Sequence, residues 1–356
     1  MTKTKTKYIF TMIFLFIIFT FQKQNFLTIQ STITIFLKSV MPSLFLFILF
    51  TNIILELDIK DGLKQIFRRN TTLIYIAIIG MFCGYPMGAK AISKYYDKKE
   101  ISYNDAMFLM SFANNANPIY IISTIGIATL ENIYLGFVLA ISHYLSSLII
   151  CIYYFHKDII HETKRNLKSK DNISNKKLHK TIFETINQAI KATYFTLSQI
   201  LAYIIIFSVL SQDARIILLK LNLPNNLIYI FESILESTSG IAKLALNYNA
   251  PTNITISLIS FILGFSGISI IFQIYSCIYN MKISIMHIIK YKLIQGLLSF
   301  CITYCLLNLL KYKFNNPINI TNIVDSINST TFFLIIASLI FIFSSTIKKV
   351  TRTKKF

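Results

Sequence analysis

Long apolar runs, separated by short basic segments, recur along this chain of 356 residues. A straight helix needs about 20 apolar residues to cross the hydrocarbon core of a membrane. The spacing of the runs therefore predicts an all-α polytopic membrane protein with about eight full spans. The expected spans are residues 8–21, 33–57, 102–130, 133–155, 181–211, 252–279, 283–310 and 332–347.

Two further apolar runs are too short to cross and are expected to form re-entrant helical hairpins. Residues 73–86 end in Gly84 and Pro86, and basic residues lie on both sides of this run. Because basic flanks favour the cytoplasmic face, both ends of the first hairpin are expected there. The second run, 225–243, is interrupted at residues 236–240. Non-helical backbone at membrane depth is tolerated only where protein or water surrounds it, so each interruption predicts a site.

Two of the expected spans are broken near their middle. Residues 114–118 carry three asparagines and a proline, and residues 264–269 carry two glycines and two serines. Carboxamides in hydrocarbon are costly unless they bind a partner. The breaks are therefore expected to face a ligand or another part of the protein.

Composition and charge support a membrane location. The chain is 54% hydrophobic and 14% charged, with a mean hydropathy of +0.59, which excludes an ordinary soluble domain. The net charge of +20 could indicate nucleic acid, but the basic residues lie in short loops, as the positive-inside rule requires. We expect a multi-pass protein of a bacterial cell membrane with both termini cytoplasmic. The loop at 156–180, with eight Lys or Arg against three acids, could bind acidic lipid, although fixing the orientation is the preferred interpretation.

The two halves of the chain follow the same plan. Pro42 and Gly84 are 42 residues apart, and so are Ser198 and Gly240. The charges place the entry of the first hairpin on the cytoplasmic side and that of the second on the outer side, so inverted repeats are expected, each with a hairpin and a broken span. The expected organisation is an extra span at 1–32, a first repeat at 33–155, a basic cytoplasmic loop at 156–180, a second repeat at 181–311, and a C-terminal span with a basic tail at 312–356.

Signals of catalysis are missing from the sequence. It contains no P-loop, no metal-ligand spacing and no paired nucleophile and base, so no enzyme activity, cofactor or metal is expected. The five cysteines all lie within apolar segments and are expected to act as small buried hydrophobes. Any energy input would come from an ion gradient or from a partner protein.

Four sequence motifs contain the interruptions of the two halves. In chain order they are Gly84-Tyr85-Pro86-Met87-Gly88-Ala89-Lys90, Ser111-Phe112-Ala113-Asn114-Asn115-Ala116-Asn117-Pro118, Glu236-Ser237-Thr238-Ser239-Gly240 and Gly264-Phe265-Ser266-Gly267-Ile268-Ser269. In this order they resemble the sporulation integral membrane protein YlbJ family. That family is part of a wider group with a nucleoside recognition, or Gate, domain, which is also similar to segments of concentrative nucleoside and ferrous-iron transporters. The resemblance covers about residues 42–304 and implies an endospore-forming bacterium, two Gate-like repeats and a role in the spore envelope, but not a particular solute.

The candidate binding residues all lie at these breaks, where free backbone groups and small side chains allow a ligand to approach. Gln273 is a further candidate at the last of them. The substrate-binding candidates are Gly84, Pro86, Gly88, Asn114, Asn115, Asn117, Pro118, Glu236, Thr238, Ser239, Gly240, Ser266, Gly267 and Ser269.

Each chemical candidate has a structural alternative. Glu236 could bind a coupling ion or a solute, or could form an ion pair with Lys243. The asparagines could contact a base edge or sugar hydroxyls, or could cap helices around Pro118. Lys90 and Lys243 are expected to extend towards the membrane interface, and His143 is expected to be a packed neutral side chain.

The leading functional hypothesis is a transporter-like membrane protein that binds or moves a small polar solute during sporulation. The alternative is a non-transporting scaffold for spore-envelope assembly, and a channel or gate is a weaker third idea. The expected partners are the lipid bilayer, a small polar solute or nucleoside with a coupling ion, and a second copy or another sporulation protein, without nucleic acid.

Overall fold

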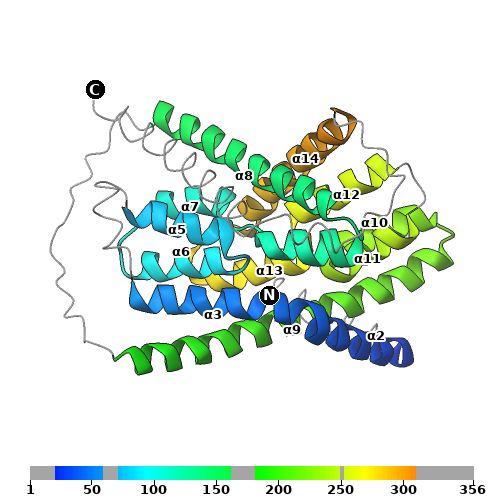
Figure 1. Ribbon diagram of the computed structural model, residues 1–356, viewed down its shortest axis with the longest axis horizontal. Coiled ribbons are helices and arrows are strands. Elements are labelled where there is room, and N and C mark those ends of the chain that lie inside the picture. Colours follow the sequence, from blue (N-terminus) through cyan, green and yellow to red (C-terminus); the bar gives the residue numbers. More distant parts are fainter. Residues whose placement is uncertain (1–20, 59–70, 162–180, 249–251, 310–356) are drawn as a thin grey trace, which may run out of the picture.

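A computed structural model describes residues 21–58, 71–161, 181–248 and 252–309 (Figure 1). Nearly all of the expected first span, the expected last span and most of the basic loop at 156–180 lie outside these residues. The described parts are helical and contain no strand, which confirms the all-α class.

The first described segment is a bent helical rod. Helix α2 (Gln22–Ile35) continues through a π-helix, η1 (Phe36–Val40), into α3 (Met41–Leu57), and the rod bends by 59° near the π-helix. Pro42 lies just after the π-helix, in the first turn of α3, and because it has no amide hydrogen it removes one hydrogen bond of the continuous rod at the bend.

The first half continues with helices that are interrupted at the two predicted positions. Two short helices form the hairpin, and the asparagine-rich break separates an α-helix from a π-helical segment that resumes the span. A long helix then returns across the molecule. These elements are α5 (Thr71–Phe82), α6 (Met87–Asp97), α7 (Tyr103–Phe112), η2 (Tyr120–Thr129) and α8 (Ile133–His161).

The second half contains the same types of element in the same order. Its first helix is 39 residues long and continues nine residues beyond the predicted end at Ser211. The breaks are narrower than predicted, because each leaves a single residue outside helix, Glu236 in one case and Ser266 in the other. The elements are α9 (Ile182–Lys220), α10 (Asn225–Leu235), α11 (Ser237–Asn247), α12 (Thr252–Phe265), α13 (Gly267–Ile278), the 3₁₀ turn η3 (Tyr279–Met281) and α14 (Ile285–Leu309).

The two hairpins lie at opposite ends of the molecule (Figure 1). The α5–α6 pair occupies one end and the α10–α11 pair the other, and their tips point towards the centre. Helix α3 packs along α9, and α12 packs along α14. The centre of the molecule is therefore the place where the interrupted segments meet.

Several helices are long and apolar enough to cross a membrane. Within the described residues there are four, or five if the bent α2–α3 rod counts as one span. The four are 133–154, 182–220, 252–281 and 285–309. These helices make the chain a polytopic membrane protein.

Candidate functional site

Glycine 84 forms the tip of the first hairpin. Its φ of +86° is a left-handed conformation that favours glycine, and a Cβ built on it would lie 3.4 Å from the Asn117 Cβ. The amide of Met87 donates to the Gly84 carbonyl at 3.0 Å, and that of Lys90 donates to the Pro86 carbonyl at 3.0 Å. The hairpin tip is therefore a tight turn that lies directly against the break between α7 and η2.

Two other glycines allow the hairpin to pack closely on this break. A Cβ on either Gly80 or Gly88 would lie 2.0 Å from the Ala113 carbonyl oxygen, which is closer than any real contact. The amide of Asn115 also donates to the Gly80 carbonyl at 3.0 Å. Gly88 thus serves close backbone packing in α6.

The three asparagines of the first break have different environments. The Asn115 amide group is fully used, because it donates to the Phe112 carbonyl at 2.8 Å and to the Ser147 hydroxyl at 3.1 Å, while its Oδ1 accepts from Gln295 at 2.6 Å. This buried side chain ties the break to α8 and α14.

Asn117 caps the resumed helix and keeps one free donor. Its Oδ1 accepts from the amide of Tyr120 at 2.5 Å, so the capping alternative around Pro118 is correct for this oxygen. Its Nδ2 is buried and has no hydrogen-bond partner in the described part of the chain, and the same holds for the Oδ1 of Asn114. An unsatisfied buried amide is costly, so these atoms are candidates for ligand contact.

Glu236 is fully buried and caps the N-terminus of α11. Its carboxylate accepts from the amide of Thr238 at 2.9 Å and from the amide and hydroxyl of Ser239, each at 2.7 Å. A carboxylate at this position is stabilised by the free amides and by the helix dipole.

The alternative of an ion pair between Glu236 and Lys243 is wrong. Lys243 instead contacts a different carboxylate, Glu232, at 2.5 Å, and Arg215 contacts the same group at 2.9 Å. No cation lies within 4 Å of the Glu236 carboxylate among the described residues.

The second broken span bends at Ser266, which has a φ of +75°. Its carbonyl accepts from the Ser237 hydroxyl at 3.0 Å, and a Cβ on Gly267 would lie 3.1 Å from that of Ser237. The second hairpin tip thus lies against the second break, as Gly84 lies against the first. The Ser266 hydroxyl is buried and, within the described residues, unpartnered.

Two other candidates of the second half have packing partners. Gly240 lies within α11 and not at the break, and a Cβ there would lie 2.3 Å from the Ser233 Cα. The hydroxyl of Ser269 accepts from Gln273 Nε2 at 3.4 Å.

A small, partly open cavity of about 30 Å³ lies where all four interrupted segments meet. Asn117, Thr238 and Gln273 supply polar groups to it, and the rings of Tyr85 and Tyr120 supply amphipathic walls. The other lining residues are Val40, Leu44, Gly84, Ala116, Ile200, Ile204 and Ile270.

Only part of the candidate set lines this cavity. Gly84, Asn117 and Thr238 do, together with the further candidate Gln273. The remaining candidates lie outside its lining, at the breaks or in the short helices next to them. They are Pro86, Gly88, Asn114, Asn115, Pro118, Glu236, Ser239, Gly240, Ser266, Gly267 and Ser269.

The sequence interpretation missed a buried lysine on α14. Lys292 is 4% exposed, donates to the Asn114 carbonyl and bonds to Gln295 Oε1 at 3.0 Å. The signal was available, because Lys292 and Gln295 are polar residues three positions apart within an apolar span, and such residues face the same side of a helix.

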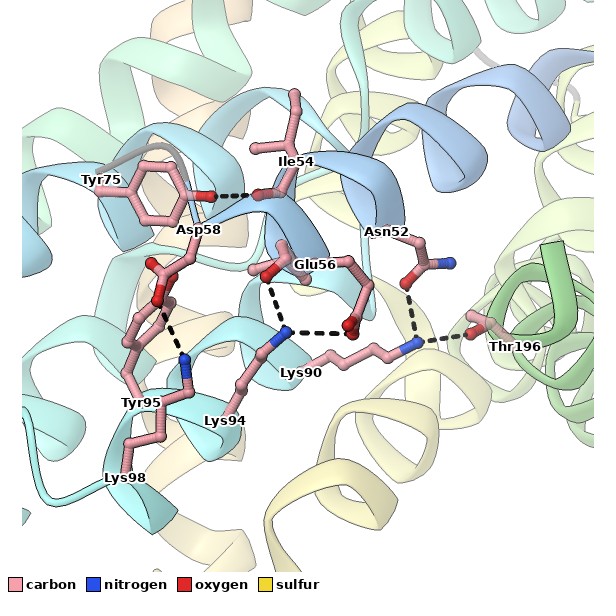
Figure 2. A network of polar contacts seen from close by, with 11 residues as sticks. Asn52, Ile54, Glu56, Asp58, Tyr75, Lys90, Lys94, Tyr95, Lys98 and Thr196 are labelled. Carbon is pink, nitrogen blue, oxygen red and sulfur yellow. Dashed lines mark hydrogen bonds and ion pairs between the residues drawn. The ribbon is translucent and has the colours of Figure 1, made fainter. Parts of the chain in front are cut away.

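Lys90 also differs from its expected role. Its ammonium donates to Asn52 at 2.9 Å and to Thr196 at 3.2 Å, which joins α6 to α3 and α9 (Figure 2). It is therefore held between three helices by contacts within the protein. His143 is packed as expected: it is fully buried, and its Nε2 accepts from the amide of Ala116 at 3.2 Å.

Part of the chain is similar to a curated bacterial protein. It is 30% identical over 117 residues to the sporulation integral membrane protein YlbJ of Bacillus subtilis (strain 168). The match covers 31% of this chain and 29% of the relative's length. No family model matches the chain, and no solved structure matches it. The chain is thus a polytopic membrane protein that resembles, over less than a third of its length, a sporulation integral membrane protein.

Proposed function

We propose that this chain is a transporter-like integral membrane protein that binds or moves a small polar solute in the cavity between its four breaks. The observation that carries the proposal is the buried Nδ2 of Asn117, which has no hydrogen-bond partner among the described residues and belongs to a side chain that lines a partly open cavity. Ligand sites are concave and mostly apolar, with a few fixed polar groups. The cavity has this character, because apolar side chains dominate its lining and two tyrosines and two polar amide side chains supply the polar groups.

We also propose that the two halves are inverted Gate-like repeats in a protein of about eight spans with cytoplasmic termini. The matching order of elements and the position of the hairpins at opposite ends of the molecule support this architecture (Figure 1). In secondary transporters built from inverted repeats, the binding site lies where the broken helices meet.

A role in sporulation is proposed from the partial similarity to the Bacillus subtilis protein, whose name describes a sporulation integral membrane protein. The four sequence motifs at the breaks agree with that assignment. A deletion strain that forms normal, resistant spores would contradict it.

Thermal unfolding of the purified protein in detergent tests solute binding. Far-ultraviolet circular dichroism would follow the helices while nucleosides, amino acids and sugars are added one at a time. We expect at least one class to raise the unfolding temperature of the wild type, and Asn117→Ala to remove that shift. Ser260→Ala is the matched control, because Ser260 is buried between α12 and α14 and contacts Ser299 and Thr303. A flat response from every class would contradict the proposal.

A non-transporting scaffold is the second candidate, and one observation favours it. Asn115 and Glu236 are largely satisfied by bonds within the protein, as expected if the breaks serve packing. Normal spores from a strain with both Asn117→Ala and Gln273→Ala, together with a stable partner in a pull-down, would support the scaffold against the transporter.

A further inference from the structure

The break after α7 leaves backbone carbonyls without helical partners, and side chains supply hydrogen bonds to them. The carbonyl of Phe112, the last residue of α7, accepts from the side chains of Asn115 and Ser147. The Ala116 carbonyl, four residues beyond the end of α7, accepts from the Tyr144 hydroxyl at 2.7 Å. Carbonyls at the C-terminal end of a helix carry partial negative charge, so the end of α7 favours hydrogen-bond donors and cations.

The ammonium of Lys292 lies at this break. It donates to the Asn114 carbonyl and to Gln295 Oε1, and it lies 5.9 Å from the centre of the Tyr85 ring. None of the ion pairs among the described residues involves Lys292. Two carbonyl oxygens and an aromatic face thus contact the buried ammonium, and proteins use such groups to bind small cations.

The ammonium is fixed by a second set of contacts. Gln295, which accepts one of its hydrogens, donates through Nε2 to Asn115 Oδ1 at 2.6 Å and to the His143 carbonyl at 3.5 Å. The Lys292 ammonium is therefore held at the break directly, through the Asn114 carbonyl, and indirectly, through Gln295 and Asn115. Lys292 and Gln295 both belong to α14, in the second half of the chain. These contacts fix the position of the ammonium, whereas apolar neighbours alone would bury a lysine without fixing it.

Transporters with broken helices bind coupling cations at this kind of place, through unwound carbonyls and the C-terminal ends of half-helices. We infer that the Lys292 ammonium is a tethered cation that fills the cation position at the α7 break, so that the protein binds its solute without free Na⁺ or K⁺. The claim that solute binding needs no free Na⁺ or K⁺ rests on the proposed transport function. The claim that the Lys292 ammonium occupies the cation position at the α7 break does not.

A salt series on the purified protein tests the inference without any solute. The unfolding temperature would be measured in NaCl, KCl and choline chloride at equal ionic strength. The wild type is expected to unfold at the same temperature in all three salts. A rise that is specific to Na⁺ or K⁺ would overturn the inference, because it would reveal a free cation site.

Removal of the tether should create a dependence on added cations. Lys292→Ala is expected to unfold several degrees lower in choline chloride and to recover part of the loss when Na⁺ or methylammonium is supplied. Lys290→Ala is the matched control, because Lys290 lies two residues away on the same helix and is exposed. An equal loss in all salts, without rescue, would show that Lys292 only fills space and would overturn the inference.

A milder variant covers the case in which Lys292→Ala does not fold. Lys292→Gln keeps most of the length and one donor for the Asn114 carbonyl but removes the charge, and the same rescue by methylammonium is expected. Absence of rescue in this variant would also overturn the inference. Because the series contains no solute, a failed solute screen and a failed cation rescue can be told apart.

Discussion

At the scale of single residues, buried polar side chains connect the breaks to the rest of the protein. Their burial follows from the sequence, since a carboxylate or carboxamide inside an apolar run must find partners. The partners do not follow, because they come from distant parts of the chain: Gln295 reaches Asn115 across 180 residues. In the structure Glu236 accepts hydrogen bonds from backbone amides and does not pair with Lys243, which was one of its predicted alternatives. Lys292, which was not predicted, contacts the first break.

Glu236 should contribute to stability mainly as a helix cap. Glu236→Ala removes the acceptor for two amides and is expected to lower the free energy of unfolding by about 1–2 kcal/mol. Glu236→Gln keeps an oxygen acceptor and should cost less. Thermal unfolding by circular dichroism checks the order, and equal losses for the two variants would show that the charge, not the cap, matters.

Even the smallest side chain at position 88 should destabilise the folded protein. Gly88→Ala places a methyl group against the Ala113 carbonyl, and such overpacking costs about 1–3 kcal/mol or more. Reduced yield of folded protein and a lower unfolding temperature are expected. Ala202→Val, at an exposed position of α9, is the control and should behave like the wild type.

At the scale of elements, lysines one turn apart on α6 attach the first hairpin to the end of α3 (Figure 2). Lys94 donates to the Leu55 carbonyl at 2.7 Å and contacts Glu56 at 3.1 Å, and Lys98 contacts Asp58 at 3.0 Å. Basic groups at a helix C-terminus are favourable because the carbonyls there are free. The contacts fix the direction in which α6 leaves the cavity.

Loss of one of these lysines should loosen the hairpin modestly. Lys94→Ala removes two partly exposed contacts, and a loss on the order of 1 kcal/mol is expected. Limited proteolysis and thermal unfolding would measure it. Lys191→Ala, at an exposed position of α9, is the control, and an equal effect from both variants would contradict the assigned role.

The element boundaries could be predicted where glycine, proline or asparagine interrupts an apolar run. The end of α9 could not be predicted in this way, because the charged residues Asp213, Arg215 and Lys220 follow the apolar run and are typical of a loop. In the structure these residues continue the helix, since Asp213 contacts Asn25 at 3.5 Å and Arg215 pairs with Glu232. Long-range partners thus extended the helix beyond its apolar part.

At the scale of the whole molecule, the interrupted segments of both halves meet around one cavity. The repeat of 42 residues predicted a common plan, although Gly240 proved to lie inside α11 while Gly84 forms a hairpin tip. The sequence could not predict which polar atoms face the cavity, because that depends on the packing of tyrosines and amides from four different segments. The long apolar helices explain why the protein lies in a membrane. The interrupted segments supply residues that line the cavity.

Thiol labelling tests most directly whether this cavity is a polar site that water reaches. In a background with the five native cysteines replaced by serine, Thr238→Cys places a thiol at the cavity, and Ser260→Cys places one between packed helices. Methanethiosulfonate ethylammonium should label Thr238→Cys in the folded protein and leave Ser260→Cys unmodified until the protein unfolds. Equal labelling of the two thiols, or no labelling of Thr238→Cys before unfolding, would contradict the account.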